Sequence, residues 1–172
     1  NDLDFDIKPG ATEVCDTVDN DCDGGTDEYP AADMSGACNG CTAIVGPGST
    51  YYLCDTPTRD WDGARAHCKT LLGDLVVIGD AMERAYLYGL FVAPGLHRWV
   101  GLGDLANEGQ FVWVDGSSLN PDIPTWGPKE PDNVDADVVG PAHCVDMAPL
   151  DGWRDESCSD THAFICEAPL TS

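Results

Sequence analysis

Apolar and polar positions divide the chain into three stretches of different character. Residues 1–30 contain almost no core-forming side chains, and residues 31–40 are mostly small or polar. Apolar patterning begins near Ile44 and continues almost to the end of the chain. A stretch without apolar positions cannot bury a core. We therefore expect an N-terminal segment at 1–30, a linker at 31–40 and one folded domain at 41–172.

Two helices are predicted near the start of this domain. Thr58 can cap the first helix, and Gly73 ends it. Four residues form its apolar face at helical spacing: Trp61, Ala64, Cys68 and Leu71. Asp80 followed three residues later by Glu83 is a capping box, which predicts a second helix that runs to about Phe91.

Strand patterns lie between and after the helices. A short buried strand is predicted at 75–78, and others are predicted at 99–103, 111–114, 145–148 and 163–167. The stretch from Asp115 to about Pro141 is rich in Pro, Asp and Gly, which indicates one long loop. Helices that precede most of the strands favour an α+β fold. Since a loop of about 25 residues is unusual in a compact domain, we expect it to carry the function.

The composition is that of a globular protein with a strongly acidic surface. Hydrophobic residues occupy 42% of the 172 positions, which is enough for a core. Asp and Glu number 31 against 8 Lys and Arg, so the formal net charge is −23. Nucleic acids and anionic membranes bind clustered basic residues, so we exclude both as partners. The acidity either keeps a secreted protein soluble or is offset by bound divalent cations.

Nine cysteines indicate an oxidising compartment, so we expect a secreted or cell-surface, extracellular protein. Cys38 and Cys41 form a C-x-x-C pair, but neither a second pair nor the spaced histidines of a zinc site accompany it. The strand-to-helix pattern of a redox motif is also missing. The sequence shows no apolar run of bilayer length and no nucleophile–base constellation, so we expect neither membrane insertion nor enzymatic activity.

An aspartate run in the N-terminal segment has the spacing of a calcium loop. Three carboxylates alternate along it, at Asp19, Asp21 and Asp23. Gly24 permits the bend that follows, and Asp27 falls at the ninth loop position. An EF-hand would have Glu at the twelfth position, where this chain has Pro30. The run is therefore either a calcium-binding spacer of EF-like spacing or an acidic tail.

Motifs in the last two thirds of the chain resemble those of one family. They are Trp99-Val100-Gly101-Leu102, Glu108-Gly109-Gln110-Phe111-Val112-Trp113, Glu130-Pro131-Asp132-Asn133 and Trp153-Arg154-Asp155. With the cysteines between them, they resemble a C-type lectin-like domain over roughly 41–168. The resemblance implies an α+β, C-type lectin-like fold with two helices, small antiparallel sheets, a long loop and disulfides. Residues 1–28 resemble MopE-type metal-binding repeats of secreted bacterial proteins, which implies bacterial surface display.

The lectin-like resemblance also implies three disulfides. The pairs are Cys41 with Cys54, Cys68 with Cys166, and Cys144 with Cys158. Cys15, Cys22 and Cys38 are left over. We expect Cys15 and Cys22 to be disulfide-bonded. Because three is odd, either one partner lies outside this sequence or one cysteine is free or pairs between molecules.

In the family that the chain resembles, a primary calcium beside the long loop can hold a sugar. The matching residues are Glu130 and Asp132, which flank Pro131, and Asp155, which follows Trp153. The resemblance implies a cis peptide bond before the proline, which directs both flanking side chains to one ion. The family uses Glu-Pro-Asn for mannose-like and Gln-Pro-Asp for galactose-like sugars. Glu-Pro-Asp is a hybrid, so the sequence does not define the sugar.

Two departures affect this primary site. Arg154 stands where the family has a coordinating Asn, and Ala142 and His143 replace acids before the loop-closing cysteine. Arg cannot ligate a cation, so its side chain either turns outward or pairs with Asp132 in place of the ion. Two other loop acids can supply the missing oxygens, Asp135 and Asp137.

A secondary calcium site is implied by three further residues, Asp104, Glu108 and Asn133. An ion there would order the long loop without touching a ligand, whereas without an ion the two acids only shape a polar turn. Trp126 is the loop tryptophan that can stack on a sugar face, although it can equally anchor the loop in the core.

Two functions follow from the resemblance. The first is calcium-dependent carbohydrate binding by Glu130, Asp132, Asn133, Asp155 and Trp126. The second is a scaffold that recognises a protein or another surface through the long loop and keeps only structural calcium. Glu130, Asp132 and Asp155 favour the first function, which we prefer, whereas Ala142 and Arg154 favour the second.

Overall fold

The computed structural model of the protein describes residues 41–91, 93, 95–133 and 142–170. The aspartate run of Asp19, Asp21, Asp23 and Asp27 lies outside the described residues. The same holds for three cysteines, Cys15, Cys22 and Cys38, and for two loop acids, Asp135 and Asp137. The expectations for these residues, and the domain boundaries drawn at 30 and 40, stay predictions.

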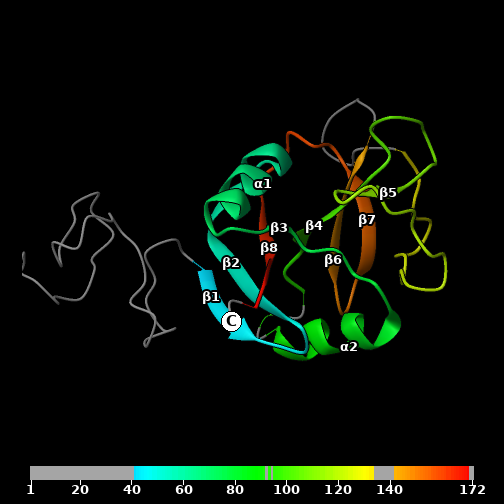
Figure 1. The fold of residues 1–172 in the computed structure, drawn as a ribbon. Coiled ribbons are helices and arrows are strands. Elements are labelled where there is room, and N and C mark those ends of the chain that lie inside the picture. The colour runs from blue at the N-terminus through cyan, green and yellow to red at the C-terminus, as the bar shows by residue number, and fades with distance from the viewer. Residues whose placement is uncertain (1–40, 92, 94, 134–141, 171–172) are drawn as a thin grey trace, which may run out of the picture.

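Two helices and eight strands make up the described part of the chain (Figure 1). In chain order they are β1 (Cys41–Val45), β2 (Ser49–Arg59), α1 (Trp61–Thr70), β3 (Asp74–Leu75), α2 (Ala81–Leu90), β4 (Arg98–Gly103), β5 (Val112–Trp113), β6 (Cys144–Ala148), β7 (Gly152–Glu156) and β8 (His162–Pro169). The sheet order is β1-β2-β8-β4-β6-β7, and β3 and β5 pair with β8 and β4. Among the pairings of these named strands, only that of β4 with β8 is parallel.

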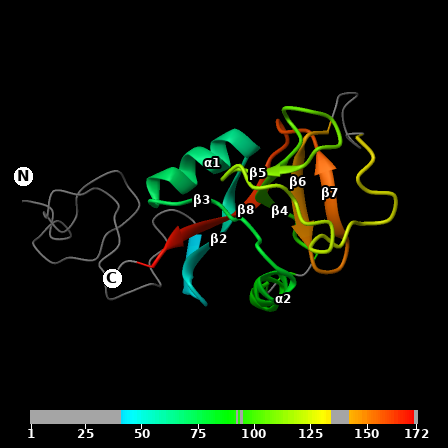
Figure 2. The ribbon, with the colours of Figure 1, turned by 45° about the vertical axis from the view of Figure 1, so that its right-hand side comes forward.

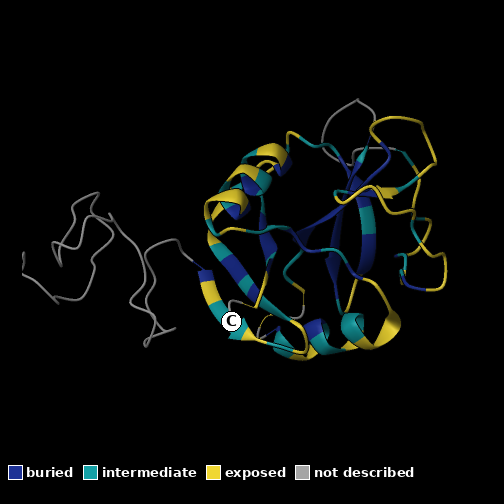
Figure 3. Ribbon diagram, in the orientation of Figure 1, coloured by how far each residue is buried: buried dark blue, intermediate teal, exposed yellow. Residues whose placement is uncertain are grey.

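The two helices cover opposite faces of β2 and β8 (Figure 2). Side chains alternate between the two faces of a strand, so neighbouring residues pack into two different hydrophobic clusters, one on each face of the sheet. Leu53 and Ile165 pack with Leu87 of α2, while Cys54 and Phe164 pack with residues of α1. Strands β4 and β6 are buried along their whole length, and more than half of the described residues between β5 and β6 are exposed (Figure 3). Helices on a largely antiparallel sheet are the α+β arrangement that the sequence predicts.

The helix starts show one correct and one wrong prediction. Asp80 caps α2, because its carboxylate accepts hydrogen bonds from the backbone N–H groups of Met82 and Glu83 at 2.8 Å. The N-cap of α1 is Asp60, whose carboxylate accepts from the N–H of Gly63, and not Thr58. Thr58 cannot serve because β2 runs on to Arg59, so the chain is still extended at that position.

The buried run at 75–78 forms less strand than predicted. Regular strand pairing is limited to β3 (Asp74–Leu75), although Val76 and Ile78 are fully buried. The N–H of Val76 donates to Ile165 O, and its carbonyl accepts from Gly101 N. A Cβ at Gly101 would lie 2.8 Å from the carbonyl oxygen of Leu75, so only glycine lets β4 approach this run. The run therefore fills the space between β8 and β4. Strand β7, in contrast, is absent from the sequence prediction.

All three implied disulfides of the described domain are present. Cys41 pairs with Cys54, Cys68 with Cys166, and Cys144 with Cys158. The second bond joins α1 to β8 across 98 residues of sequence, and the third ties β6 to the segment after β7. Neither described helix has the length and apolarity that a bilayer crossing requires.

Candidate functional site

Three carboxylates converge where the long loop meets β7. Glu130 and Asp132 come from the loop, Asp155 comes from β7, and one oxygen of each lies within 4.8 Å of the others. Asp155 is 2% exposed, Glu130 is half-buried and Asp132 is exposed. The cluster thus has a rigid, buried floor and a side that is open to solvent. The structure brings these three predicted residues together.

The loop is fixed to β7 through Trp153. The Trp153 backbone N–H donates to Thr125 O, and its carbonyl accepts from Gly127 N, both at 2.9 Å. Its fully buried indole donates to the hydroxyl of Tyr88 in α2 at 2.7 Å. Trp126 is half-buried and packs between Phe111 and Trp153, with ring centroids 5.2 and 6.2 Å away. These contacts anchor the loop, and ligand contact by Trp126 stays a prediction.

Asp155 also orders the segment that carries the other two acids. One of its oxygens accepts from the backbone N–H of Asp132 at 3.0 Å and the other from that of Asn133 at 2.8 Å. The Glu130–Pro131 peptide bond is cis, as the resemblance implies. Since Asp155 lies on the same face of β7 as the buried Trp153, its position is set by the core.

Negative charge is concentrated in this cluster. Burial, a hydrogen bond with Asp155 and the charge of Asp132 together raise the pKa of Glu130 to about 7. Glu130 Oε2 and Asn133 Oδ1 are buried and have no hydrogen-bond partner among the described residues. A buried oxygen without a donor is costly, and crowded carboxylates favour a bound cation. The donors are all oxygen atoms, which are the ligands that calcium takes, so the residues fit that ion.

The guanidinium of Arg154 is not directed into the loop cluster. Successive side chains of β7 point to opposite faces, so Arg154 lies on the other face from Asp155. Its guanidinium forms ion pairs with Asp146 at 2.7 Å and with Glu156 at 3.0 Å. Of the two expected arrangements, the structure therefore shows the outward one. Arg154 offers no oxygen where the resemblance implies a coordinating Asn, and its charge is balanced by acids on its own face.

A second cluster contains Asp104, Glu108 and His143, with one ligand atom of each within 4.8 Å of the others. His143 Nδ1 lies 3.0 Å from Asp104 Oδ1 and 3.6 Å from Glu108 Oε2. Partial desolvation and the nearby Asp104 carboxylate raise the pKa of Glu108. The sequence prediction gave Asn133 as the third residue of this site, which stays a prediction, and the structure places His143 beside the two acids. The signal for it is positional, since His143 directly precedes the loop-closing Cys144.

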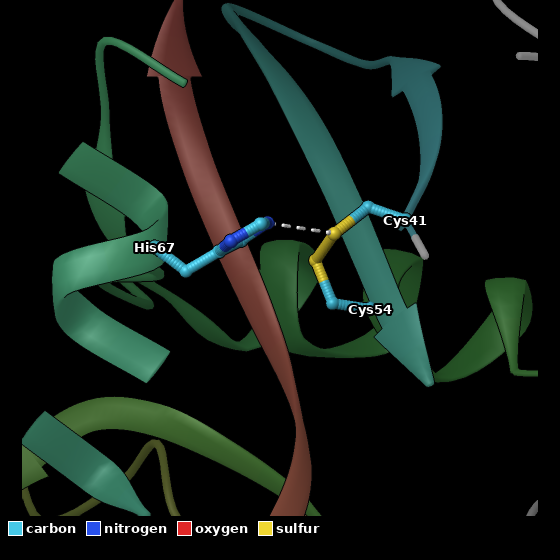
Figure 4. Close-up of side chains that lie close together, drawn as sticks. All are labelled: Cys41, Cys54 and His67. Carbon is cyan, nitrogen blue, oxygen red and sulfur yellow. Dashed lines mark hydrogen bonds between the residues drawn. A yellow bond between two sulfur atoms is a disulfide. The ribbon is translucent and has the colours of Figure 1, made fainter. Parts of the chain in front are cut away.

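A third group joins the Cys41–Cys54 disulfide and His67 (Figure 4). His67 Nε2 lies 3.5 Å from Cys41 Sγ, and its ring stands edge-on to Phe164. Burial and the charge of Arg59 lower the pKa of His67. A metal binds thiolates, and these two sulfurs are bonded to each other, so the group is structural.

The comparisons with known proteins identify the chain's relatives. A family model described as the lectin C-type domain matches residues 58–168, and a metal-binding motif of MopE type matches residues 1–28. The human C-type lectin domain family 17 member A is 35% identical over 121 residues, which cover 70% of this chain and 29% of that protein. The chain thus spans under a third of the length of that relative.

Solved structures agree with this relationship. The cow C-type carbohydrate-recognition domain of CD23, solved in the presence of a GlcNAc2Man3 oligosaccharide, is 30% identical, with a TM-score of 0.65 over 76% of this chain and 95% of that one. The herring type II antifreeze protein, 22% identical with a TM-score of 0.62 over 75% of this chain and 97% of that one, shares the fold. Because the family model matches 58–168 and a relative is 35% identical over 70% of this chain, the chain belongs to the C-type lectin domain family.

Proposed function

We propose that this domain is a calcium-dependent carbohydrate-binding module. The proposal rests on the convergence of Glu130, Asp132 and Asp155 at an open edge, with crowding strong enough to raise the pKa of Glu130 to about 7. These three side chains would hold the ion, and the buried Asn133 Oδ1 offers a neutral oxygen beside them. A bound calcium would supply open coordination positions for vicinal sugar hydroxyls.

The family relationship and the disulfides support the proposal. The related cow domain was solved in the presence of an oligosaccharide, and it covers most of the described part of this chain. Three disulfides fit a secreted or cell-surface protein, because such bonds persist in oxidising compartments. One site of this kind binds a single sugar at about millimolar Kd, so useful binding needs several copies.

The N-terminal segment has a separate role in the proposal. Its match to a metal-binding motif covers 1–28 and includes Asp19, Asp21 and Asp23. Alternate carboxylates followed by Gly24 suit calcium without a hydrophobic core. We propose that this segment binds calcium and acts as a stiffened spacer beside the lectin domain.

Recognition of a protein or another surface is the second candidate. Ala142 is fully buried and its side chain offers no oxygen, which reduces the ligand set of the loop site. The herring antifreeze protein has the same fold under a different functional name, so the fold alone does not define the ligand. In this case calcium would stiffen the loop without touching the partner.

The deciding experiment is Asp132→Ala in the full chain. We expect this variant to lose calcium-dependent binding on a glycan array and to weaken calcium binding at the loop by more than about tenfold, because it removes one of three charged ligands. Asp122→Ala, an exposed acid of the same loop, is the matched control and should change neither property. Unchanged glycan binding by Asp132→Ala would contradict the proposal. Calcium binding by the wild type without any glycan signal would favour the second candidate.

Calcium binding at the loop should also weaken on acidification. The pKa of Glu130 in the cation-free protein is raised from 4.5 to about 7, and calcium needs the ionised carboxylate. Below about pH 7 each unit should therefore cost up to about tenfold in affinity. Titration calorimetry at pH 8 and pH 6 measures this difference, which should be much smaller in Glu130→Gln.

The raised pKa of Glu130 also determines whether the stability of the chelated protein rises or falls with pH. A carboxyl whose folded-state pKa is raised stabilises the folded state at low pH, and this contribution is lost as pH rises from about 4.5 to about 7. The Tm of the chelated protein should therefore fall between about pH 5 and pH 8. A Tm that rises over this range, after correction with Glu130→Gln, would contradict the assignment.

A further inference from the structure

The cluster of Asp104, Glu108 and His143 does not fit the secondary calcium site that the sequence suggests. Calcium takes six to eight oxygen ligands at about 2.3–2.6 Å and seldom accepts nitrogen. Here the third group is an imidazole, whose Nδ1 faces both carboxylates. Imidazole nitrogen favours zinc and other borderline transition metals, and two carboxylates complete a mixed donor set. The chemistry of the donors therefore differs from that of the loop site.

We propose that Asp104, Glu108 and His143 form a binding site for a divalent transition metal of the zinc class. Zinc binds nitrogen and oxygen ligands at about 2.0–2.2 Å, so neighbouring ligand atoms in a tetrahedral site stand about 3.4 Å apart. Nδ1 of His143 lies 3.0 Å from Asp104 Oδ1 and 3.6 Å from Glu108 Oε2. The ligand atoms therefore need only a small adjustment to accept such an ion.

The surrounding structure holds two of the three ligands in place. Asp104 is 1% exposed, and its Oδ2 accepts from the backbone N–H of Gly109 at 2.7 Å, which leaves Oδ1 directed at His143. The backbone of His143 is held on both sides, because its carbonyl accepts from Asp104 N and its N–H donates to Glu156 O. Hydrogen-bonded neighbours of this kind fix the orientation of metal ligands.

The third ligand leaves the site accessible. The Glu108 side chain is 52% exposed, whereas that of Asp104 is fully buried. An ion can therefore enter past Glu108, and a water molecule can take the fourth position. The metal would join the turn after β4 to the residue before β6. The site shares no residue with the cluster of Glu130, Asp132 and Asp155, so its metal binding does not require sugar binding there.

The test is a zinc titration of the full chain in excess calcium, which fills the all-oxygen sites. The readout is the ring signals of the four histidines in a long-range ¹H–¹⁵N NMR spectrum. We expect one imidazole to shift on zinc addition, and its signal to be the one missing from His143→Asp and His143→Asn. The other three histidines serve as internal controls. Zinc affinity should fall by at least about 100-fold in both variants.

His143→Asp offers an independent second readout. It replaces the nitrogen donor with a carboxylate, so this variant should bind one more calcium than the wild type while it loses zinc. His143→Asn supplies an oxygen without the added charge, so it should gain less calcium affinity than His143→Asp, which separates donor chemistry from a general loosening of the turn. If zinc leaves the His143 signal unchanged, or binds equally well to His143→Asn, the proposal is wrong and His143 only donates a hydrogen bond to Asp104.

Discussion

Asp155→Ala should abolish calcium binding at the long loop and also destabilise the domain. The side chain supplies the buried charge of the three-carboxylate cluster, so we expect the loop calcium affinity to fall by more than about 100-fold. Its two oxygens also accept the backbone N–H groups of Asp132 and Asn133. Loss of both charge-assisted bonds should cost about 2–4 kcal/mol in saturating calcium.

A graded pair of variants separates the two roles of this residue. Asp155→Asn keeps one oxygen that can accept from the loop backbone, but it loses the charge that calcium needs. Its calcium affinity should therefore fall nearly as far as in the alanine variant, while its loss of stability should be smaller. Asp151→Asn changes an acid in the neighbouring turn and should leave both quantities near wild type. Denaturant unfolding and calcium calorimetry measure the two effects.

The chelated proteins supply the decisive contrast. Without a cation, the carboxylate of Asp155 helps to raise the pKa of Glu130, so its removal relieves repulsion. The destabilisation by Asp155→Ala should therefore be smaller in chelator than in calcium. An equal loss of stability under both conditions would show that Asp155 acts only as a loop cap, and it would contradict the calcium site.

Local signals in the sequence were sufficient for much of this fold. The pair Asp80 and Glu83 marks the start of α2 because capping depends only on neighbouring backbone groups. The end of β2 required more information, since both Thr58 and Asp60 are good caps and the choice depends on how far the strand pairs. Pairing partners are distant in sequence, and periodicity does not identify them.

The candidate site shows the same division between local and distant information. The motifs predicted that Glu130, Asp132 and Asp155 meet, and the structure agrees. The direction of the Arg154 side chain could not be predicted from the sequence, because it depends on the pleat of β7. The mixture of aromatic and charged residues in β7 does not show the pattern of a strand. The approach of His143 to Asp104 depends on the pairing of β6 with β4. Both details underlie the ions that we propose for the two clusters.

Removal of the Cys68–Cys166 bond should cause the largest loss of stability of any change considered. Both residues are fully buried, and the bond closes a loop across 98 positions between α1 and β8. In the chain-entropy model, a loop of this length contributes about 4.7 kcal/mol, while one like that of Cys144–Cys158 contributes about 3 kcal/mol. Cys68→Ala/Cys166→Ala should therefore lower the free energy of unfolding by more than Cys144→Ala/Cys158→Ala does.

The loss of metal affinity should be ordered in the opposite way to the loss of stability in the two double variants. Cys144 follows His143, and Cys158 lies two residues beyond Glu156, so this bond braces β6 and β7 beside the proposed metal ligands. Cys68 and Cys166 lie in α1 and β8, and neither element carries a residue of the two carboxylate clusters. Under conditions where both double variants are folded, Cys144→Ala/Cys158→Ala should lose more calcium and zinc affinity although it is the more stable protein. If the less stable double variant also lost more metal affinity, metal binding would depend on global stability. The sites would then not be held by the local disulfide.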